Sequence, residues 1–282
     1  MNRDKIPNRN ITLPIIHWRF PEAAKFGRVI PKEKLYQQAN VSAALKQRFV
    51  EQVGQIKWVY KLAEGTTNLA KTDSVTEIEI IQITLKSKGL DENILAAIDK
   101  AIPHPTLFVL KRYQNNQGDN DSNDESAESE QICITAAHKA KENIASGKET
   151  WQQSQYLNSA WFQPTQVTAM PLPTATNLER LYEQLLEALI PNSPEQNTSH
   201  PDDASSQISE TKAKYQTEAI NQAKQTTIKE KLATLAEIEA LNKKLQQVKS
   251  KRGKEKQFNR RRELNDDYKA LKKQIAQLQA RI

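Results

Sequence analysis

The sequence predicts an α/β or α+β head built on a central mixed sheet, followed by an all-α, coiled-coil-like helical hairpin. In the first 190 residues, apolar runs typical of buried strands alternate with amphipathic helical segments, which is the pattern of a β-α-β unit. From residue 210 onward the chain contains one Gly and no Pro, and its apolar residues recur every three or four positions, as in long paired helices.

Composition divides the chain into three parts. Hydrophobic residues make up 37% of it, below the roughly 45–50% of typical globular proteins, so part of the chain is expected to pack no core. A head occupies 1–190 and contains an acidic loop at 114–130 that is either disordered or an enlarged hairpin loop. A polar linker follows at 191–209, and a basic coiled-coil-like region occupies 210–282.

The first strong signal in the head is helical. Ser42 is suited to N-cap a helix, and Gly65 is suited to end one. Between them, apolar residues recur at steps of three and four, at Leu45, Phe49, Val53, Ile56 and Tyr60. We therefore expect a single helix from Ser42 to about Gly65.

The next segments predict a β-α-β unit. Residues 77–86 read EIEIIQITLK and are apolar on both faces, as in a strand inside a sheet. Asp91 is suited to N-cap a short helix that must end before Pro103, and 106–110 is a second buried strand. A strand, a helix and a strand with short connections favour parallel pairing of the two strands.

The remainder of the head predicts more sheet and one more helix. Strands are expected at 131–138 and at 151–162, the latter with Trp151, Tyr156 and Trp161 as large anchors. A clear amphipathic helix begins after Asn177 and ends at Pro191.

Two apolar seams run through the tail. The first extends from Ile228 to Val248, and the second steps by four and three residues, as a heptad does. A hairpin turning near 251–253 fits this pattern, and one long helix that pairs with a second copy of the chain fits nearly as well. The second seam is the predicted partner-binding surface and consists of Leu264, Tyr268, Leu271, Ile275 and Leu278.

Positive charge is concentrated in one segment of the tail. The chain has a net charge of +7, and the stretch 249–262 holds eight cations against one acid, Glu255, so this segment alone equals the whole excess. Such a cluster is suited to bind phosphates, although Lys and Arg also serve simply to solvate a long helix. The predicted nucleic-acid-binding residues are Lys249, Lys251, Arg252, Lys254, Lys256, Arg260, Arg261 and Arg262.

Several classes of chemistry find no support in the sequence. Cys133 is the single cysteine, which excludes an internal disulfide and a multi-cysteine zinc site. The four histidines are scattered without i, i+4 partners, and no Gly-rich phosphate loop is present, so we predict no metal, no cofactor and no catalytic residue. With no signal peptide and no long apolar run, we expect a cytoplasmic protein that is not bound to a membrane.

Carboxylates around the central strand offer one enzymatic alternative. A metal-dependent nuclease would use Glu77 or Glu79 together with Lys86. However, the residue two positions before Lys86 is Thr84, where such a site needs an acid. The alternative is therefore a divergent or degenerate nuclease.

Five segments carry a resemblance to a known family: 30–32, 35–36, FVEQVGQIKWVYKL at 49–62, LDENILAAIDKAIPHP at 90–105 and EKQFNRRRELN at 255–265. With these, the chain resembles an uncharacterised bacterial family that is catalogued as a domain of unknown function. Its members look like companions of DNA methyltransferases and helicases in restriction or phage-defence gene clusters. No catalytic residue follows from the resemblance.

The leading hypothesis is a non-catalytic accessory or scaffold subunit of a bacterial DNA-modification, restriction or anti-phage system. The head would dock a DNA methyltransferase or helicase, and the tail would supply a coiled-coil contact, DNA binding through its basic segment, or homo-oligomer formation. The alternatives are the divergent nuclease and a purely structural coiled-coil adaptor.

Overall fold

The computed structural model describes residues 13–115, 128–143, 149–191 and 227–281. These residues form two compact units, a head within 13–191 and a tail within 227–281, which are described separately. None of the helices in the described ranges is long and apolar enough to cross a membrane.

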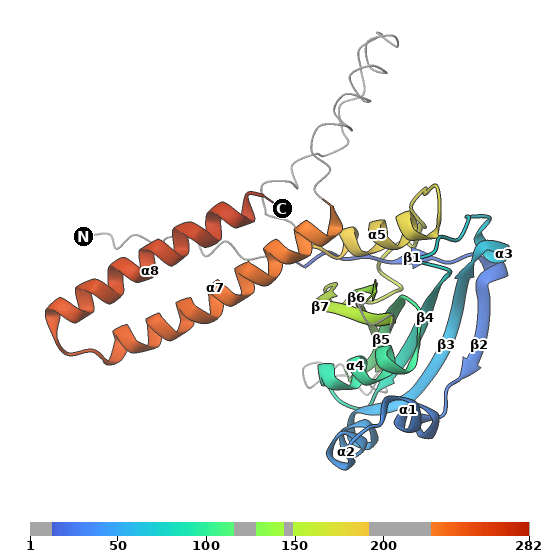
Figure 1. Ribbon diagram of the computed structural model, residues 1–282. Helices are drawn as coiled ribbons and strands as arrows, with labels where there is room; N and C mark the ends of the chain where they lie inside the picture. The colour runs from blue at the N-terminus through green and yellow to red at the C-terminus, as the bar shows by residue number, and fades with distance from the viewer. Residues whose placement is uncertain (1–12, 116–127, 144–148, 192–226, 282) are drawn as a thin grey trace, which may run out of the picture. The chain divides into compact units, whose positions relative to one another are not determined.

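The head is built on a six-stranded mixed sheet with the strand order β2-β3-β4-β5-β6-β7 (Figure 1). β4 and β5 pair in parallel, and the other four neighbouring pairs are antiparallel. The strands are β2 (Lys25–Val29), β3 (Val53–Ala63), β4 (Glu77–Leu85), β5 (Thr106–Asn115), β6 (Glu128–Asn143) and β7 (Glu149–Asn158). This topology places the head in the α+β class, which agrees with the mixed sheet predicted from the sequence.

The predicted β-α-β unit is confirmed. β4, helix α4 (Glu92–Ala101) and β5 follow one another, and β4 pairs with β5 in parallel. The Asp91 carboxylate accepts a hydrogen bond from the backbone N–H of Asn93 and so caps α4. The helix ends at Ala101 because Pro103 follows closely and disfavours helical backbone before it.

The single helix predicted from Ser42 to Gly65 is wrong beyond Gln52. Ser42 does cap a helix, α2 (Ala43–Gln52), but the chain then continues as β3, an eleven-residue strand. Branched and aromatic residues in β3 suit a strand as well as a helix, and pairing with both β2 and β4 decides between them. Gly54 also favours the strand, because the absence of a side chain lets β3 approach β4 closely. A Cβ at this position would lie 3.2 Å from the carbonyl oxygen of Thr84 on β4.

Helices α1 (Lys32–Ala39), α2 and α4 supply the main apolar core on one face of the sheet. From the helices, Leu35, Phe49 and Ile98 are buried in this core. From the strands, Ile81, Ile83 and Phe108 complete it. Because side chains alternate along a strand, Glu79 lies on the same face of β4 as Ile81 and Ile83.

The strands predicted at 131–138 and 151–162 correspond to β6 and β7, although β7 ends at Asn158. β5 and β6 are antiparallel partners in which Asn115 pairs with Glu128, so the predicted acidic loop joins the two strands of a hairpin. Its residues 116–127, like residues 192–209 of the predicted linker, lie outside the described residues.

The remaining elements of the head are short, apart from one helix. β1 (Trp18–Arg19) pairs with β8 (Met170–Pro171), and η1 (Glu22–Ala24) and α3 (Glu64–Thr67) each form about one turn. The predicted helix after Asn177 is confirmed as α5 (Leu178–Ala188), which Asn177 caps and which contacts β4 and β6.

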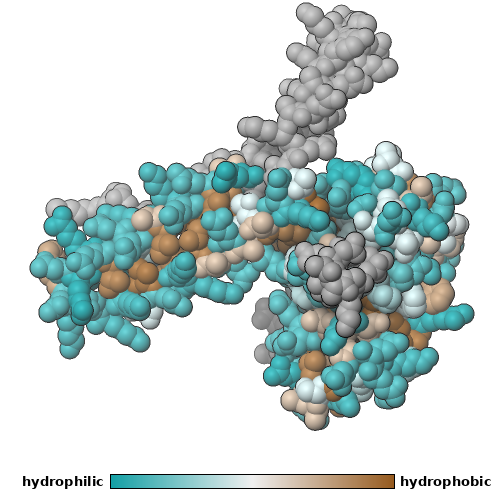
Figure 2. Space-filling model, in the orientation of Figure 1, coloured by the Kyte–Doolittle hydropathy of each residue, from teal (hydrophilic) through white to brown (hydrophobic). Residues whose placement is uncertain are grey.

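The tail consists of α7 (Ile228–Lys254) and α8 (Phe258–Gln279), which lie side by side in opposite directions. Ile238 of α7 is buried against Ile275 and Leu278 of α8, with Leu241 and Leu245 packed around them. Figure 2 shows hydrophobic surface along the helix pair, flanked by hydrophilic surface. The turn falls after Lys254, later than the predicted 251–253, because Gly253 keeps helical geometry within α7.

Candidate functional site

Two carboxylates and one imidazole meet at one edge of the sheet. Glu77 and Glu79 lie at the start of β4, and His104 precedes β5. Because β4 and β5 are parallel and Glu79 pairs with Thr106, the starts of both strands lie at the same edge. One potential ligand atom from each of Glu77, Glu79 and His104 lies within 4.8 Å of the other two.

Glu79 is a buried acid without a hydrogen-bond partner. Its side chain is 0% exposed, and neither carboxylate oxygen accepts a hydrogen bond among the described residues. Burial, reinforced by the nearby negative charge of Glu77, raises the pKa of Glu79 to about 8. Glu77 and the indole of Trp58 lie close enough to Glu79 to raise and to lower this pKa, respectively, but neither makes a hydrogen bond of acceptable geometry with it. Glu79 is therefore an acid that holds its proton at neutral pH unless a cation replaces the proton.

Glu77 lies between the side chains of Lys61 and His104. Its Oε2 is 2.5 Å from Lys61 Nζ, and its Oε1 is 2.9 Å from His104 Nε2. Partial burial opposes ionisation of Glu77, but the hydrogen bond from Lys61 and the charge of His104 outweigh it and hold the pKa below its ordinary value. One ionised carboxylate thus lies beside one that is protonated at neutral pH.

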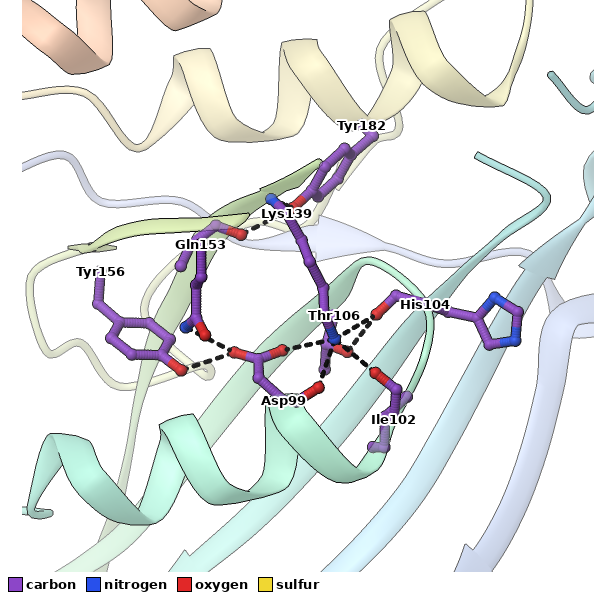
Figure 3. Close-up of polar contacts among 9 residues, drawn as sticks. Asp99, Ile102, His104, Thr106, Lys139, Gln153, Tyr156 and Tyr182 are labelled. Atoms are coloured by element: carbon purple, nitrogen blue, oxygen red, sulfur yellow. Dashed lines mark hydrogen bonds and ion pairs between the residues drawn. The ribbon is translucent and has the colours of Figure 1, made fainter. Parts of the chain in front are cut away.

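A second polar cluster holds the backbone that carries His104 (Figure 3). The Lys139 ammonium, from β6, donates hydrogen bonds to the carbonyl oxygens of Asp99, Ile102 and His104, the last at 3.2 Å. Asp99 and Ile102 stand at the end of α4, so the ammonium satisfies helix carbonyls that lack an internal partner. This contact fixes the course of the chain from α4 into β5.

Asp99 balances the charge of Lys139 inside the protein. Asp99 Oδ1 is 3.6 Å from Lys139 Nζ, and both side chains are less than 5% exposed. The Asp99 carboxylate also accepts hydrogen bonds from the Tyr156 hydroxyl, at 2.6 Å, and from Gln153 Nε2, at 3.2 Å. Burial raises the pKa of Asp99 and lowers the pKa of Lys139 despite their mutual attraction.

Tyr182 connects this cluster to α5. Its hydroxyl donates to the carbonyl oxygen of Ala137, at 2.7 Å, and accepts from the backbone N–H of Lys139, at 3.0 Å. The cluster therefore joins α4, β6, β7 and α5 around the segment that carries His104.

The residues of the predicted nuclease do not all meet. Lys86 directly follows β4 and lies seven residues after Glu79, which at about 3.3 Å per residue of strand is roughly 23 Å away. Its ammonium donates to the carbonyl oxygen of Val50 instead. Lys61 is the lysine beside the carboxylates, because it is the direct partner of Glu79 across β3 and β4.

The predicted nucleic-acid-binding residues surround the turn between α7 and α8. Seven of the eight cations are exposed, and the eighth, Arg252, is half-buried. The Arg252 guanidinium lies 4.6 Å from the centre of the Tyr268 ring and donates to Asn265 Oδ1 at 3.0 Å. Phe258, the first residue of α8, is 79% exposed beside them.

The predicted partner-binding residues lie along the side of α8 that faces α7. Ile275 and Leu278 are buried in the contact between the two helices, and Leu264, Tyr268 and Leu271 are half-buried. Part of the predicted partner-binding surface is therefore buried in the contact between α7 and α8 of the same chain.

The sequence matches a protein family over residues 19–275, which include both the Glu77–Glu79–His104 cluster and the basic turn. The chain belongs to the family described as "Domain of unknown function (DUF4391)". The expected resemblance to an uncharacterised family of this kind is thereby confirmed. No curated protein and no solved structure matches the chain.

Sequence reasoning did not anticipate the cluster in this DUF4391 protein. The four histidines have no i, i+4 partners, and His104 lies between Pro103 and Pro105, where a turn that ends a helix accounts for it equally well. The signal was present in the β-α-β prediction, because parallel strands with residues 77–79 and 104–106 at their starts bring those residues to one edge.

Proposed function

We propose that this DUF4391 protein is a non-catalytic accessory subunit of a bacterial DNA-modification, restriction or anti-phage system, and that it binds DNA through the basic turn of its tail. The observation that carries the proposal is the set of seven exposed cations around the turn between α7 and α8. None of these seven forms an ion pair with a carboxylate in the described part of the chain.

The arrangement suits the phosphate backbone better than base edges. Lys251 and Lys254 are three residues apart on one face of α7, about 4.5 Å along the helix axis, which is comparable to the axial spacing of about 3.4 Å between neighbouring phosphates on one strand. Glu263, Asp266 and Asp267 on α8 reduce the local charge, so that 249–267 holds eight cations and four acids. We therefore expect moderate, salt-sensitive binding with little sequence preference.

The role as a subunit of a larger system is supported by the resemblance of the five sequence segments given above. In this proposal the head docks a DNA methyltransferase or helicase, and the tail holds the DNA. Co-purification of the tagged chain with such an enzyme tests the docking. If the chain binds neither the enzyme nor DNA, the proposal as a whole is refuted.

DNA binding is tested by fluorescence anisotropy of a labelled duplex across a salt series. The variant replaces Lys251, Lys254, Arg260 and Arg261 by Gln, and the control replaces Lys243, Lys244, Lys269 and Lys273, which are exposed on the same helices and remove the same charge. For the unmodified chain, contact with five to seven phosphates gives a log–log salt slope of about −4 to −6. The first variant should lose most of the affinity and the slope, and the control should lose little. Equal losses in both variants would show that general charge, and not the turn, attracts the DNA.

The nuclease alternative is distinguished by its product. Plasmid DNA incubated with the protein and Mg²⁺ or Mn²⁺ should remain intact under the proposed function. Cleavage that disappears in Glu79→Gln would instead establish the enzyme, and the absence of both cleavage and DNA binding would favour the structural adaptor.

A further inference from the structure

The state of Glu79 calls for an explanation. A carboxyl group that is fully buried without a hydrogen-bond partner is costly, and native proteins rarely keep one without a specific reason. The group is not isolated, because it faces Glu77 and His104 within 4.8 Å. Two arrangements would relieve the cost: a cation between the three side chains, or a proton shared between the two glutamates.

We propose that Glu77, Glu79 and His104 bind a divalent first-row transition metal ion such as Zn²⁺ or Mn²⁺. Carboxylate oxygens and an imidazole nitrogen bind such ions at about 2.0–2.2 Å, so ligand atoms on one ion lie at most about 4.4 Å apart. The observed separations of up to 4.8 Å need only a small inward movement of side chains. The single imidazole favours these ions over Mg²⁺ and Ca²⁺, which prefer oxygen ligands.

The charges around the site fit a cation. Two ionised glutamates contribute two negative charges, and Lys61 compensates one of them through the outer oxygen of Glu77. With His104 neutral, one negative charge remains in a buried position. A bound divalent ion offsets this negative charge, leaves the group with one net positive charge, and removes the cost of ionising Glu79.

The surroundings also orient the ligands. Thr76 Oγ1 lies 3.4 Å from His104 Nδ1, which leaves Nε2 as the atom directed toward the glutamates. Lys139 holds the carbonyl oxygen of His104, so the imidazole is carried by a fixed backbone. The side chains of Glu77 and His104 are 17% and 29% exposed, and an ion can enter from their side.

The test measures metal binding by the full chain. The protein is first treated with EDTA to remove bound metal, and the EDTA is then removed. Isothermal titration with Zn²⁺ and with Mn²⁺ should show one ion per chain, and Co²⁺ should give visible absorption bands that report nitrogen and oxygen ligands. Glu79→Gln keeps the shape of the side chain and should weaken binding by about 100-fold or more, and His104→Gln should do the same. The matched controls Glu51→Gln, an exposed glutamate, and His17→Gln, a histidine outside the cluster, should bind as the unmodified chain does.

Two results would overturn the inference. If the unmodified chain binds neither ion stoichiometrically, Glu79 shares a proton with Glu77 instead. If Glu79→Gln binds as tightly as the unmodified chain, the ion is bound elsewhere. Circular dichroism of each variant confirms that it is folded, and the DNA affinity of Glu79→Gln should be unchanged, which separates this inference from the proposed function.

Discussion

Lys139→Met should destabilise the head, because it removes the ammonium from a buried site without changing the length of the side chain much. In the protein this ammonium binds three carbonyl oxygens and lies 3.6 Å from Asp99 Oδ1. Methionine leaves the three carbonyl oxygens without this donor and leaves the Asp99 charge without its counter-ion.

The magnitude follows from the burial of both charges. Breaking a buried ion pair by removing one partner costs about 3–5 kcal/mol, mostly because the other charge is left uncompensated. Asp99 keeps the hydrogen bonds from Tyr156 and Gln153, so we expect a loss near the lower end, about 3 kcal/mol. In the double variant Lys139→Met, Asp99→Asn both charges are absent, and its loss should be smaller than the sum of the two single losses by about 1–3 kcal/mol.

Denaturation in urea followed by tryptophan fluorescence measures this effect. All four tryptophans of the chain (Trp18, Trp58, Trp151 and Trp161) lie in the head, so the signal reports the head without a contribution from the tail. Lys100→Met is the matched control, because Lys100 is the exposed neighbour of Asp99 on α4, and it should change stability by less than about 0.5 kcal/mol. A loss in Lys139→Met no larger than in Lys100→Met, or an additive double variant, would refute the reasoning.

Three further outcomes are expected. In the presence of EDTA, folded Glu79 keeps its proton up to a pKa of about 8 instead of the ordinary 4.5, so its contribution to stability is complete below pH 4.5 and is lost as the pH rises toward 8. Between these values the stability should fall by about 1.4 kcal/mol per pH unit, and thermal melts at several pH values should show that Glu79→Gln lacks this fall. Gly253→Ala should stabilise α7 by about 0.5–1 kcal/mol, measured by hydrogen exchange, because a Cβ there meets no atom within 4 Å; slower exchange should be absent if Gly253 marked a break in the helix. Phe258→Ala should leave stability unchanged and weaken single-stranded DNA binding by about 5-fold or more if the exposed ring stacks on a base, whereas equal anisotropy curves would exclude stacking.

The parts of the fold that were predicted correctly are those whose signals are local. The side chains of Asp91 and Asn177 cap the helices that follow them in sequence. The run at 77–86 is apolar on both faces, so it predicts a buried strand whichever face is turned to the core. The error at 53–63 has a different origin. Val53 and Ile56 are three residues apart, which fits a helix better than a regular strand, and both are buried in β3 because its register shifts between Val53 and Gln55. The strand is formed by pairing with β2 and β4, and β4 is distant in sequence.

The candidate site was predicted less completely than the fold. Glu77 and Glu79 attracted attention as carboxylates on a strand, but Lys86 was expected beside them and Lys61 is there instead. His104 comes from a loop 25 residues away, and it is the parallel pairing of β4 and β5, not a spacing in the sequence, that connects it to Glu79. The Asp99–Lys139 pair was hidden for a similar reason, because Asp99 sits among apolar residues of α4 and its partner lies two strands further along the chain.

The pairing of Asn115 with Glu128 makes the connection between β5 and β6 replaceable. Since these two residues are neighbours across an antiparallel ladder, a two-residue turn such as Asn-Gly could join them in place of the twelve residues 116–127. The reverse operation is also tolerable, because each doubling of a loop's length costs only about 0.6 kcal/mol in closure entropy. This connection is therefore the position at which an epitope or a reporter peptide can be spliced into the head while the β5–β6 ladder keeps its register.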